Sequence, residues 1–260
     1  MKLNFPTHFR VEYPDENRKY YAASNKHVLA NKLLFASQGF CMYCGKRINH
    51  DDNPIYNLEH SIEKTIDENE YYILRHCKFN ISIACPTCNQ KYKKRMNEIV
   101  DSEEVRKLLD VDEKECLQKH CKIPCQRYNK LKEEYLTRNH ILLQPLGAEG
   151  CAIQYDMLKQ VFRPNAKEKE KKSIIQEHIN RFHLNSEMYS NTVLHICEFI
   201  VAIEDNAKSG LDCEGLFNIL AVYRVENRIG LEFIDFLKEY FYDMEELLEF
   251  CEMLLILDFV

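Results

Sequence analysis

Two Cys-x-x-Cys motifs constrain this chain more than any other feature of its sequence. The first runs from Cys41 to Cys44 and the second from Cys85 to Cys88, with forty residues between them. Two such motifs together offer four thiolates, which complete the tetrahedral shell of a structural zinc site, and Gly45 suits the tight turn after the first motif. The alternative is a redox or core-thiol role, but no thioredoxin-like βαβ pattern surrounds either motif. We therefore predict that these four cysteines bind Zn²⁺.

The rest of the sequence favours reduced cysteines. The first residues, MKLNFPTHFRVEYPDENRKYY, contain no apolar segment of the kind found in a signal peptide. No stretch reaches the roughly 18 apolar residues of a membrane span, and the nearest, Ile196–Ile203, contains Glu198. We expect a cytoplasmic protein without a membrane partner, in which thiols stay reduced and serve as metal ligands rather than as disulfides.

The formal net charge of −6 is concentrated at one end of the sequence. Residues 231–260 contain nine acidic residues and one basic residue, so this segment carries −8 and the remainder carries +2. The overall acidity therefore does not exclude a nucleic-acid partner, because the weakly basic remainder has to be judged separately from the acidic end.

The composition favours helices. Glycine and proline number 7 each in 260 residues, well below the usual frequencies of about 7% and 5%. The predicted helices are Ala22–Ser37, a helical region over 101–135, Glu168–Phe182, a helix from Asn185 or Ser186 to Ser209–Gly210, and Phe236–Leu255. Within residues 140–163 we predict strands at Ile141–Leu143 and Ala152–Tyr155, on either side of a Gly147–Gly150 turn.

These elements predict an α+β, mostly helical fold with two domains. Residues 1–165 would form a metal-binding domain with an N-terminal helical extension and the β-turn segment, and residues 166–260 a helical domain that positions substrate or binds a partner. The last predicted helix carries an apolar stripe, which we interpret as core packing; the alternative is a partner-binding face with an acidic rim. The stripe comprises Tyr240, Met244, Leu247, Leu248, Cys251, Leu254 and Leu255.

Between and after the two motifs lies an ordered set of polar residues. Glu59 and His60 are adjacent, Asn80 lies five residues before the second motif, and Asn89 follows that motif directly. A basic run then contains Lys91, Lys93, Lys94 and Arg95. Over about residues 39–95 this arrangement resembles the HNH endonucleases of the ββα-metal (His-Me finger) superfamily, in the branch that carries CxxC zinc knuckles.

The resemblance implies a small ββα-metal core that hydrolyses nucleic-acid phosphodiester bonds, with DNA favoured over RNA. It implies that His60 is the general base and that Asn80 holds the loop and orients that base. Glu59 and Asn89 match the positions that hold a catalytic divalent cation, such as Mg²⁺. The basic residues Lys91, Lys93, Lys94 and Arg95 would grip backbone phosphates, although Lys93 and Lys94 could equally form a solvated face.

Two features of the sequence depart from the family pattern. Glu63 stands where the family often has proline, and Lys91–Lys94 replaces the usual Lys-Gly after the second motif. Asn89 could serve as a helix cap. Adjacent strand residues point to opposite faces, so Glu59 and His60 can share a site only at a bulge or a strand edge.

A looser resemblance covers Ile141–Lys208. Its layout is similar to that of bacterial HNH proteins which include the nuclease subunit of Septu and retron-associated anti-phage systems. That resemblance implies an effector nuclease with an ABC-type ATPase partner. The competing interpretation of the whole chain is a zinc-stapled scaffold that binds nucleic acid or a protein without cutting.

A further group, Cys116, His120, Cys121 and Cys125, could bind a second metal, but we favour reduced, partly buried thiols there because three ligands on one short helix rarely surround a tetrahedral ion. The remaining cysteines occur in apolar contexts and are interpreted as small core residues. They are Cys77, Cys151, Cys197, Cys213 and Cys251.

Overall fold

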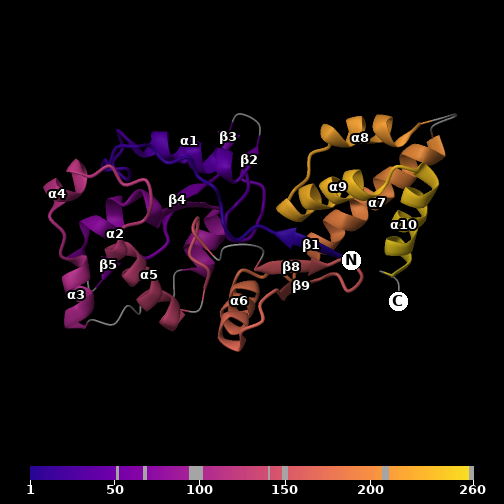
Figure 1. The fold of residues 1–260 in the computed structure, drawn as a ribbon. Coiled ribbons are helices and arrows are strands. Elements are labelled where there is room, and N and C mark those ends of the chain that lie inside the picture. The colour runs from indigo at the N-terminus through magenta and orange to yellow at the C-terminus, as the bar shows by residue number, and fades with distance from the viewer. Residues whose placement is uncertain are drawn as a thin grey trace.

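A computed structural model describes residues 1–50, 53–66, 69–93, 102–139, 141–147, 152–206 and 211–257. Helices predominate over short strands, which confirms the predicted α+β, mostly helical class. Figure 1 shows α1–α5 and the shortest strands at one end of the molecule, α7–α10 at the other, and a three-stranded sheet with α6 between them. In the part of the chain that the structure describes, no helix is both long enough and apolar enough to cross a bilayer.

The central sheet joins the first residues of the sequence to a segment in its middle. It is antiparallel in the order β1–β8–β9, with bounds Lys2–Phe5, Ile153–Asp156 and Val161–Pro164. Alternate side chains enter the core, among them Phe5 and Phe162, whose ring centroids lie 5.4 Å apart. The predicted strand near Ala152–Tyr155 is confirmed, whereas β1 was not predicted.

The strand predicted at Ile141–Leu143 is wrong. These residues are buried but pair with no neighbouring strand among the described residues. Leu142 instead donates its backbone N–H to the ring of His178, which lies 3.3 Å away. An apolar run of three residues therefore identified burial correctly but not the hydrogen-bonding partner.

The N-terminal end is built from short elements around a two-stranded antiparallel ladder. In that ladder β4 (Asn57–His60) pairs with β7 (Ile81–Ala84), so that Glu59 lies opposite Ser82 and His60 opposite Ile81. The helices are α1 (Lys26–Ala36), α2 (Tyr72–His76), α3 (Glu103–Leu109), α4 (Glu113–Gln118) and α5 (Gln126–Asn139). Short turns of helix cover Lys78–Asn80 and Cys88–Tyr92, and two further strand pairs join β2 (Asn49–His50) to β3 (Asn53–Pro54) and β5 (Thr65–Ile66) to β6 (Asn69–Glu70).

The C-terminal end is helical, as predicted. Its helices are α6 (Lys169–Arg181), α7 (Glu187–Asn206), α8 (Cys213–Ala221), α9 (Arg228–Tyr240) and α10 (Met244–Leu257). The single helix predicted over Phe236–Leu255 is wrong, because Phe241 is extended and the carboxylate of Asp243 accepts the N–H of Glu246 to begin a new helix. Asp243 is a typical N-cap residue and could have predicted the start of α10, but the apolar pattern continues across it and favoured a single helix.

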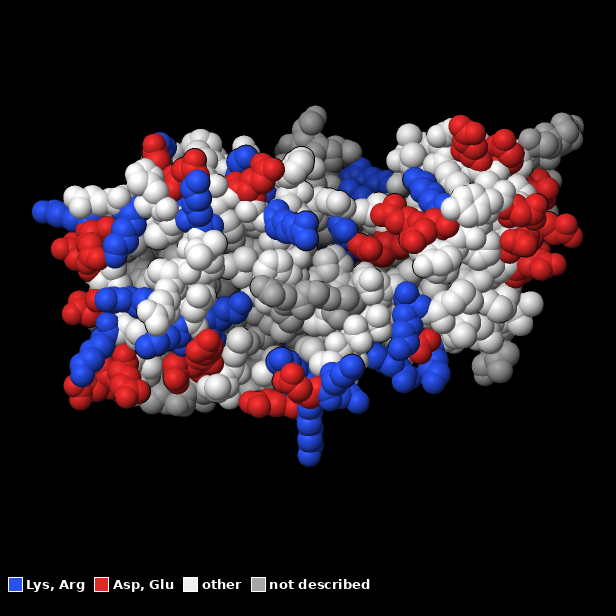
Figure 2. Space-filling model, in the orientation of Figure 1, with Lys and Arg blue, Asp and Glu red and all other residues white. Residues whose placement is uncertain are grey.

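The apolar stripe on the last helix is core, as we interpreted it. Leu247, Cys251 and Leu254 are fully buried, and α10 packs along α7, while Tyr240 remains 60% exposed. The acidic side chains of this segment face solvent instead. Figure 2 shows acidic side chains gathered over both α8 and α10, whereas basic and acidic side chains are mixed over the opposite end of the molecule.

The C-terminal helices hold the loop of the first Cys-x-x-Cys motif. The Tyr189 hydroxyl donates to the carbonyl of Cys44 at 2.6 Å, and the Arg228 N–H donates to the carbonyl of Gly45 at 2.7 Å. Contacts therefore cross the boundary predicted at residue 165, and the metal motif is supported by both parts of the sequence.

His178 makes a third such connection and gives the fold a pH dependence. Its buried ring accepts the Leu142 N–H at Nδ1 and donates from Nε2 to the Tyr43 carbonyl at 3.2 Å, an arrangement that only the neutral ring can make. Burial lowers the pKa of His178 to about 4. Because the unfolded chain binds a proton on this ring below about pH 6.5 and the folded chain does not, stability falls as the pH falls through that range.

We expect His178 to account for about 1 kcal/mol of lost stability per pH unit between about pH 6 and 4.5. Urea unfolding of the wild type and of His178→Gln across pH 7.5 to 4.5 measures this contribution. The free energy of unfolding should depend less steeply on pH in the variant. At the acid end of the range the difference in slope should correspond to close to one proton taken up on unfolding. Equal slopes would contradict the account.

Candidate metal centre and adjoining cleft

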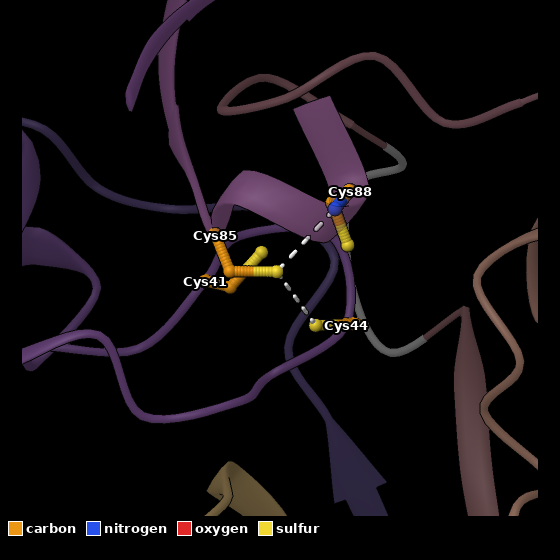
Figure 3. Close-up of side chains that lie close together, drawn as sticks. All are labelled: Cys41, Cys44, Cys85 and Cys88. Carbon is orange, nitrogen blue, oxygen red and sulfur yellow. Dashed lines mark hydrogen bonds between the residues drawn. The ribbon is translucent and has the colours of Figure 1, made fainter. Parts of the chain in front are cut away.

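The four cysteines of the two motifs meet in one cluster. Their sulfur atoms all lie within 4.8 Å of one another, and all four residues are buried. Figure 3 shows the side chains converging from the two motifs, with Cys44 Sγ 3.8 Å from Cys85 Sγ. Tetrahedral Zn–S bonds of about 2.3 Å place sulfurs about 3.8 Å apart, so the cluster has the dimensions of a Cys₄ zinc site. The predicted grouping is confirmed, and these four residues could hold a structural metal such as zinc.

The turns around the cluster are built for close approach. Gly45 adopts a positive φ of 69°, and a Cβ there would lie 2.7 Å from the ring of Phe5, so a glycine is required. The Cys88 N–H donates to Cys85 Sγ at 3.4 Å. Hydrogen bonds from neighbouring thiols lower the pKa of Cys85, and a bound dication would deprotonate the thiols of the cluster.

Glu59 and His60 lie side by side on β4 and point to different surroundings, as the alternation of a strand requires. The Glu59 carboxylate is 4% exposed and accepts hydrogen bonds from the hydroxyls of Tyr43 at 2.6 Å and Ser82 at 2.8 Å. Its second oxygen is ion-paired with the ammonium group of Lys93. The glutamate is therefore enclosed by donors from the protein itself.

The predicted phosphate-gripping residues differ in their placement. Lys91 is exposed, but Lys93 is 3% exposed and bonds to both the Glu59 carboxylate and the His60 carbonyl. In this structure Lys93 is an internal counter-ion, not a surface contact. Lys94 and Arg95 lie outside the described residues.

The ring of His60 is held in one tautomer. Its Nε2 lies 3.1 Å from the backbone carbonyl of Arg75, which can only accept, so Nε2 carries the proton and Nδ1 keeps its lone pair. Tyr21 contacts the ring with centroids 4.2 Å apart. Burial, more than the nearby positive charges, lowers the pKa of His60 to about 4, which keeps the ring neutral. No described residue hydrogen-bonds to Nδ1, so this nitrogen remains able to accept a proton.

Asn80 holds the chain immediately after His60. Its side-chain oxygen accepts the Ile62 N–H at 2.9 Å, and its amide donates to the carbonyls of Ile62 at 2.8 Å and Leu74 at 2.6 Å. These bonds tie the chain after β4 to Leu74 of α2. The next residue of α2, Arg75, hydrogen-bonds to the His60 ring through its carbonyl. Asn80 therefore links the loop after β4 to α2, and its role in orienting a base stays a prediction.

A cleft of about 560 Å³ runs beside β4 and contains the remaining predicted residue, Asn89. Its walls include Tyr21, which also contacts His60, and Lys26 and His27 at the start of α1. Asn57 lines it as well, and the buried Nδ2 of Asn57 has no acceptor among the described residues. An unsatisfied donor beside a cationic lysine suits an anionic or carbonyl-bearing ligand.

Sequence reasoning missed Tyr21, Lys26, His27 and Asn57 as members of this cleft. No motif marks the first three, because α1 reaches the cleft only through tertiary packing. Asn57 could have been found from its position two residues before Glu59, since alternate strand residues share a face.

The residues predicted to hold Mg²⁺ fit such an ion only in part. Asn89 lies in the open cleft, where its amide oxygen could ligate a hard cation. The Glu59 carboxylate, in contrast, already bonds to Tyr43, Ser82 and Lys93, and the Lys93 ammonium supplies the positive charge beside it. A cation could bind Glu59 only after Lys93 moved away, so Glu59 is not a cation ligand in this arrangement.

Comparison with models of known protein families, with curated proteins and with solved structures finds no match. Any function of the site is therefore inferred from the sequence and from the geometry of its residues.

The Lys93–Glu59 pair predicts a large effect on stability. Lys93→Met is expected to lower the free energy of unfolding by about 3–5 kcal/mol, because it leaves the Glu59 carboxylate buried without its counter-ion. Lys91→Met is the matched control, since it changes an exposed lysine of the same turn and should cost no more than about 0.5 kcal/mol. Urea unfolding of both zinc-loaded variants makes the measurement, and equal small losses would show that the pair does not form.

Proposed function

We propose that this protein is a nuclease of the HNH type, in which His60 acts as general base on water that attacks a nucleic-acid phosphodiester. The observation that carries the proposal is the fixed tautomer of His60, with its Nδ1 lone pair kept free by the Arg75 carbonyl. The buried ring of His178 uses both of its nitrogens in hydrogen bonds that hold the fold, whereas at His60 only Nε2 is hydrogen-bonded by a described residue, which leaves Nδ1 for proton transfer. The metal cluster supports the proposal by rigidly connecting the segments before β4 and after β7.

In the proposed reaction the Nδ1 atom of His60 removes a proton from water, and the oxygen bonds to phosphorus as the bond to the 3′-oxygen breaks. Asn80 and the Arg75 carbonyl keep the ring oriented during this transfer. Lys26, His27, Asn57 and Asn89 line the cleft in which the backbone phosphate would bind. A divalent cation, such as Mg²⁺, would supply charge stabilisation at the leaving oxygen when carried in with the phosphate.

The partner is also part of the proposal. The similarity to bacterial HNH proteins over Ile141–Lys208 implies an ABC-type ATPase in an anti-phage system, with the nuclease as its effector. The α9–α10 end offers exposed apolar side chains, with Tyr242 84% and Ile256 63% exposed, among acidic residues. These features suit docking of a partner with a basic, partly apolar surface.

The direct test incubates the purified full-length protein with supercoiled plasmid and, separately, with single-stranded RNA, in Mg²⁺ or in EDTA. We expect Mg²⁺-dependent nicking of the plasmid, with less cleavage of RNA. Absence of cleavage in Mg²⁺ and Mn²⁺, with and without a co-expressed ATPase partner, would favour the scaffold interpretation instead.

A further inference from the structure

A second group of cysteines lines a separate cavity. This cavity of about 290 Å³ lies between α2, the turn at Lys78–Asn80 and the segment that contains α4. Four thiols border it, those of Cys77, Cys116, Cys121 and Cys125. None of them belongs to the first cluster, and Figure 1 shows α4 at the end of the molecule farthest from α7–α10.

The segment that supplies three of these thiols has little hydrophobic anchoring. None of the residues 110–127 is fully buried, and only Val111 and Cys121 among them pack partly buried against the core. Ile123, an apolar residue of this segment, is 75% exposed. A stretch with so little buried apolar surface gains from another link to the body of the protein, and in small modules a metal commonly provides that link.

The hydrogen bonds at these sulfurs repeat a feature of the first cluster. The Tyr128 N–H donates to Cys125 Sγ at 3.5 Å, three residues along the chain, just as the Cys88 N–H donates to Cys85 Sγ. Asn17 also donates from Nδ2 to Cys121 Sγ at 3.3 Å. Hydrogen bonds of this kind, from neighbouring N–H groups to sulfur, also surround and orient the thiolate ligands of metal sites.

The cavity alters the ligand set expected from the sequence. His120 is exposed and does not border the cavity, whereas Cys77, which we interpreted as a core thiol, does. Cys77 comes from the body of the protein, at the end of α2, and the other three cysteines from the weakly anchored segment. This division overcomes the objection that one short helix cannot surround an ion, because the fourth ligand approaches from the opposite wall.

We propose that Cys77, Cys116, Cys121 and Cys125 bind a second structural Zn²⁺, which fastens residues 110–127 to the body of the protein. Soft thiolate ligands select zinc over magnesium or calcium, and binding releases the thiol protons to solvent. Among the described residues only the first cluster has all its ligand atoms within 4.8 Å. In the proposed site the segment would have to move toward Cys77 to bring the four sulfurs together, and the residues that would move, 110–127, are half-buried or exposed.

The test is the zinc content of the full-length protein, purified without chelator and measured by mass spectrometry of the metal. We expect two zinc ions per wild-type chain and one in Cys121→Ser/Cys125→Ser. The control is Cys213→Ser, a cysteine that borders neither the first cluster nor this cavity, and it should retain two. One ion in the wild type, or two in the double variant, would overturn the proposal.

A second measurement separates loss of metal from loss of fold. Trypsin can cut at Lys119 and Lys122, which are exposed in the segment. The double variant should be cut there at least about tenfold faster than the wild type, because the segment is released, while its thermal unfolding transition stays cooperative. Unchanged cleavage, or a disulfide among these cysteines in protein kept under reducing conditions, would also contradict a zinc staple. Neither readout depends on nuclease activity.

Discussion

Cys44→Ser/Cys88→Ser is expected to lose the first zinc ion and with it the cooperative fold of the chain. Structural zinc sites contribute about 10–16 kcal/mol of apparent binding free energy, which is comparable to or larger than the roughly 5–15 kcal/mol of net stability of a typical protein. The loss should reach the C-terminal helices as well, because Tyr189 and Arg228 bond to the carbonyls of Cys44 and Gly45.

Near-ultraviolet circular dichroism and thermal unfolding, measured beside zinc content, test this expectation. Cys197→Ala/Cys251→Ala is the matched control, since it removes another pair of buried cysteines, one on α7 and one on α10. That control should lose only a few kcal/mol and keep its zinc. A Cys44/Cys88 variant that melts cooperatively near the wild-type temperature would show that the cluster is not a structural metal site.

His60→Ala should abolish cleavage while sparing the fold. Removal of a general base typically lowers the rate by about 10²–10⁴, and we expect a loss in that range for single-turnover cleavage. The substitution removes one hydrogen bond, to the Arg75 carbonyl, and the packing of the ring on Tyr21, both at the end of the ladder that lies away from the cysteine cluster. The thermal transition should therefore shift by only a few degrees.

His195→Ala is the control for this experiment, because His195 is an exposed histidine on α7 at the other end of the molecule. It should cleave at the wild-type rate. If His60→Ala cuts as fast as His195→Ala, His60 is not the base, whatever the metal cluster does.

The parts of the site that follow from local chemistry could be predicted from the sequence. The spacing within and between the Cys-x-x-Cys motifs determined which four sulfurs meet, and strand alternation explained why Glu59 and His60 have different neighbours. The parts that depend on long-range packing could not. A lysine in a basic run gives no sign that it will be buried against Glu59, and nothing in residues 2–5 reveals a partner strand at 153–156.

The second group of cysteines shows the same limit. Its three nearby members, Cys116, Cys121 and Cys125, were visible as a cluster, but Cys77 joins them only through the placement of α2. Sequence separation concealed that Cys77 borders the same cavity as the other three thiols, which is the observation on which the proposed second site depends.

The central claim, that the neutral ring of His60 removes a proton from the attacking water, is tested most directly by chemical rescue. His60→Ala leaves a space between Tyr21 and the Arg75 carbonyl into which free imidazole can diffuse. Single-turnover plasmid cleavage by zinc-loaded His60→Ala should rise with added imidazole by at least about tenfold and saturate, and the rate should increase as the pH is raised through the pKa of imidazole. Two results would contradict the account. One is cleavage by His60→Ala at the wild-type rate without imidazole, and the other is cleavage by His60→Ala that does not rise at any imidazole concentration.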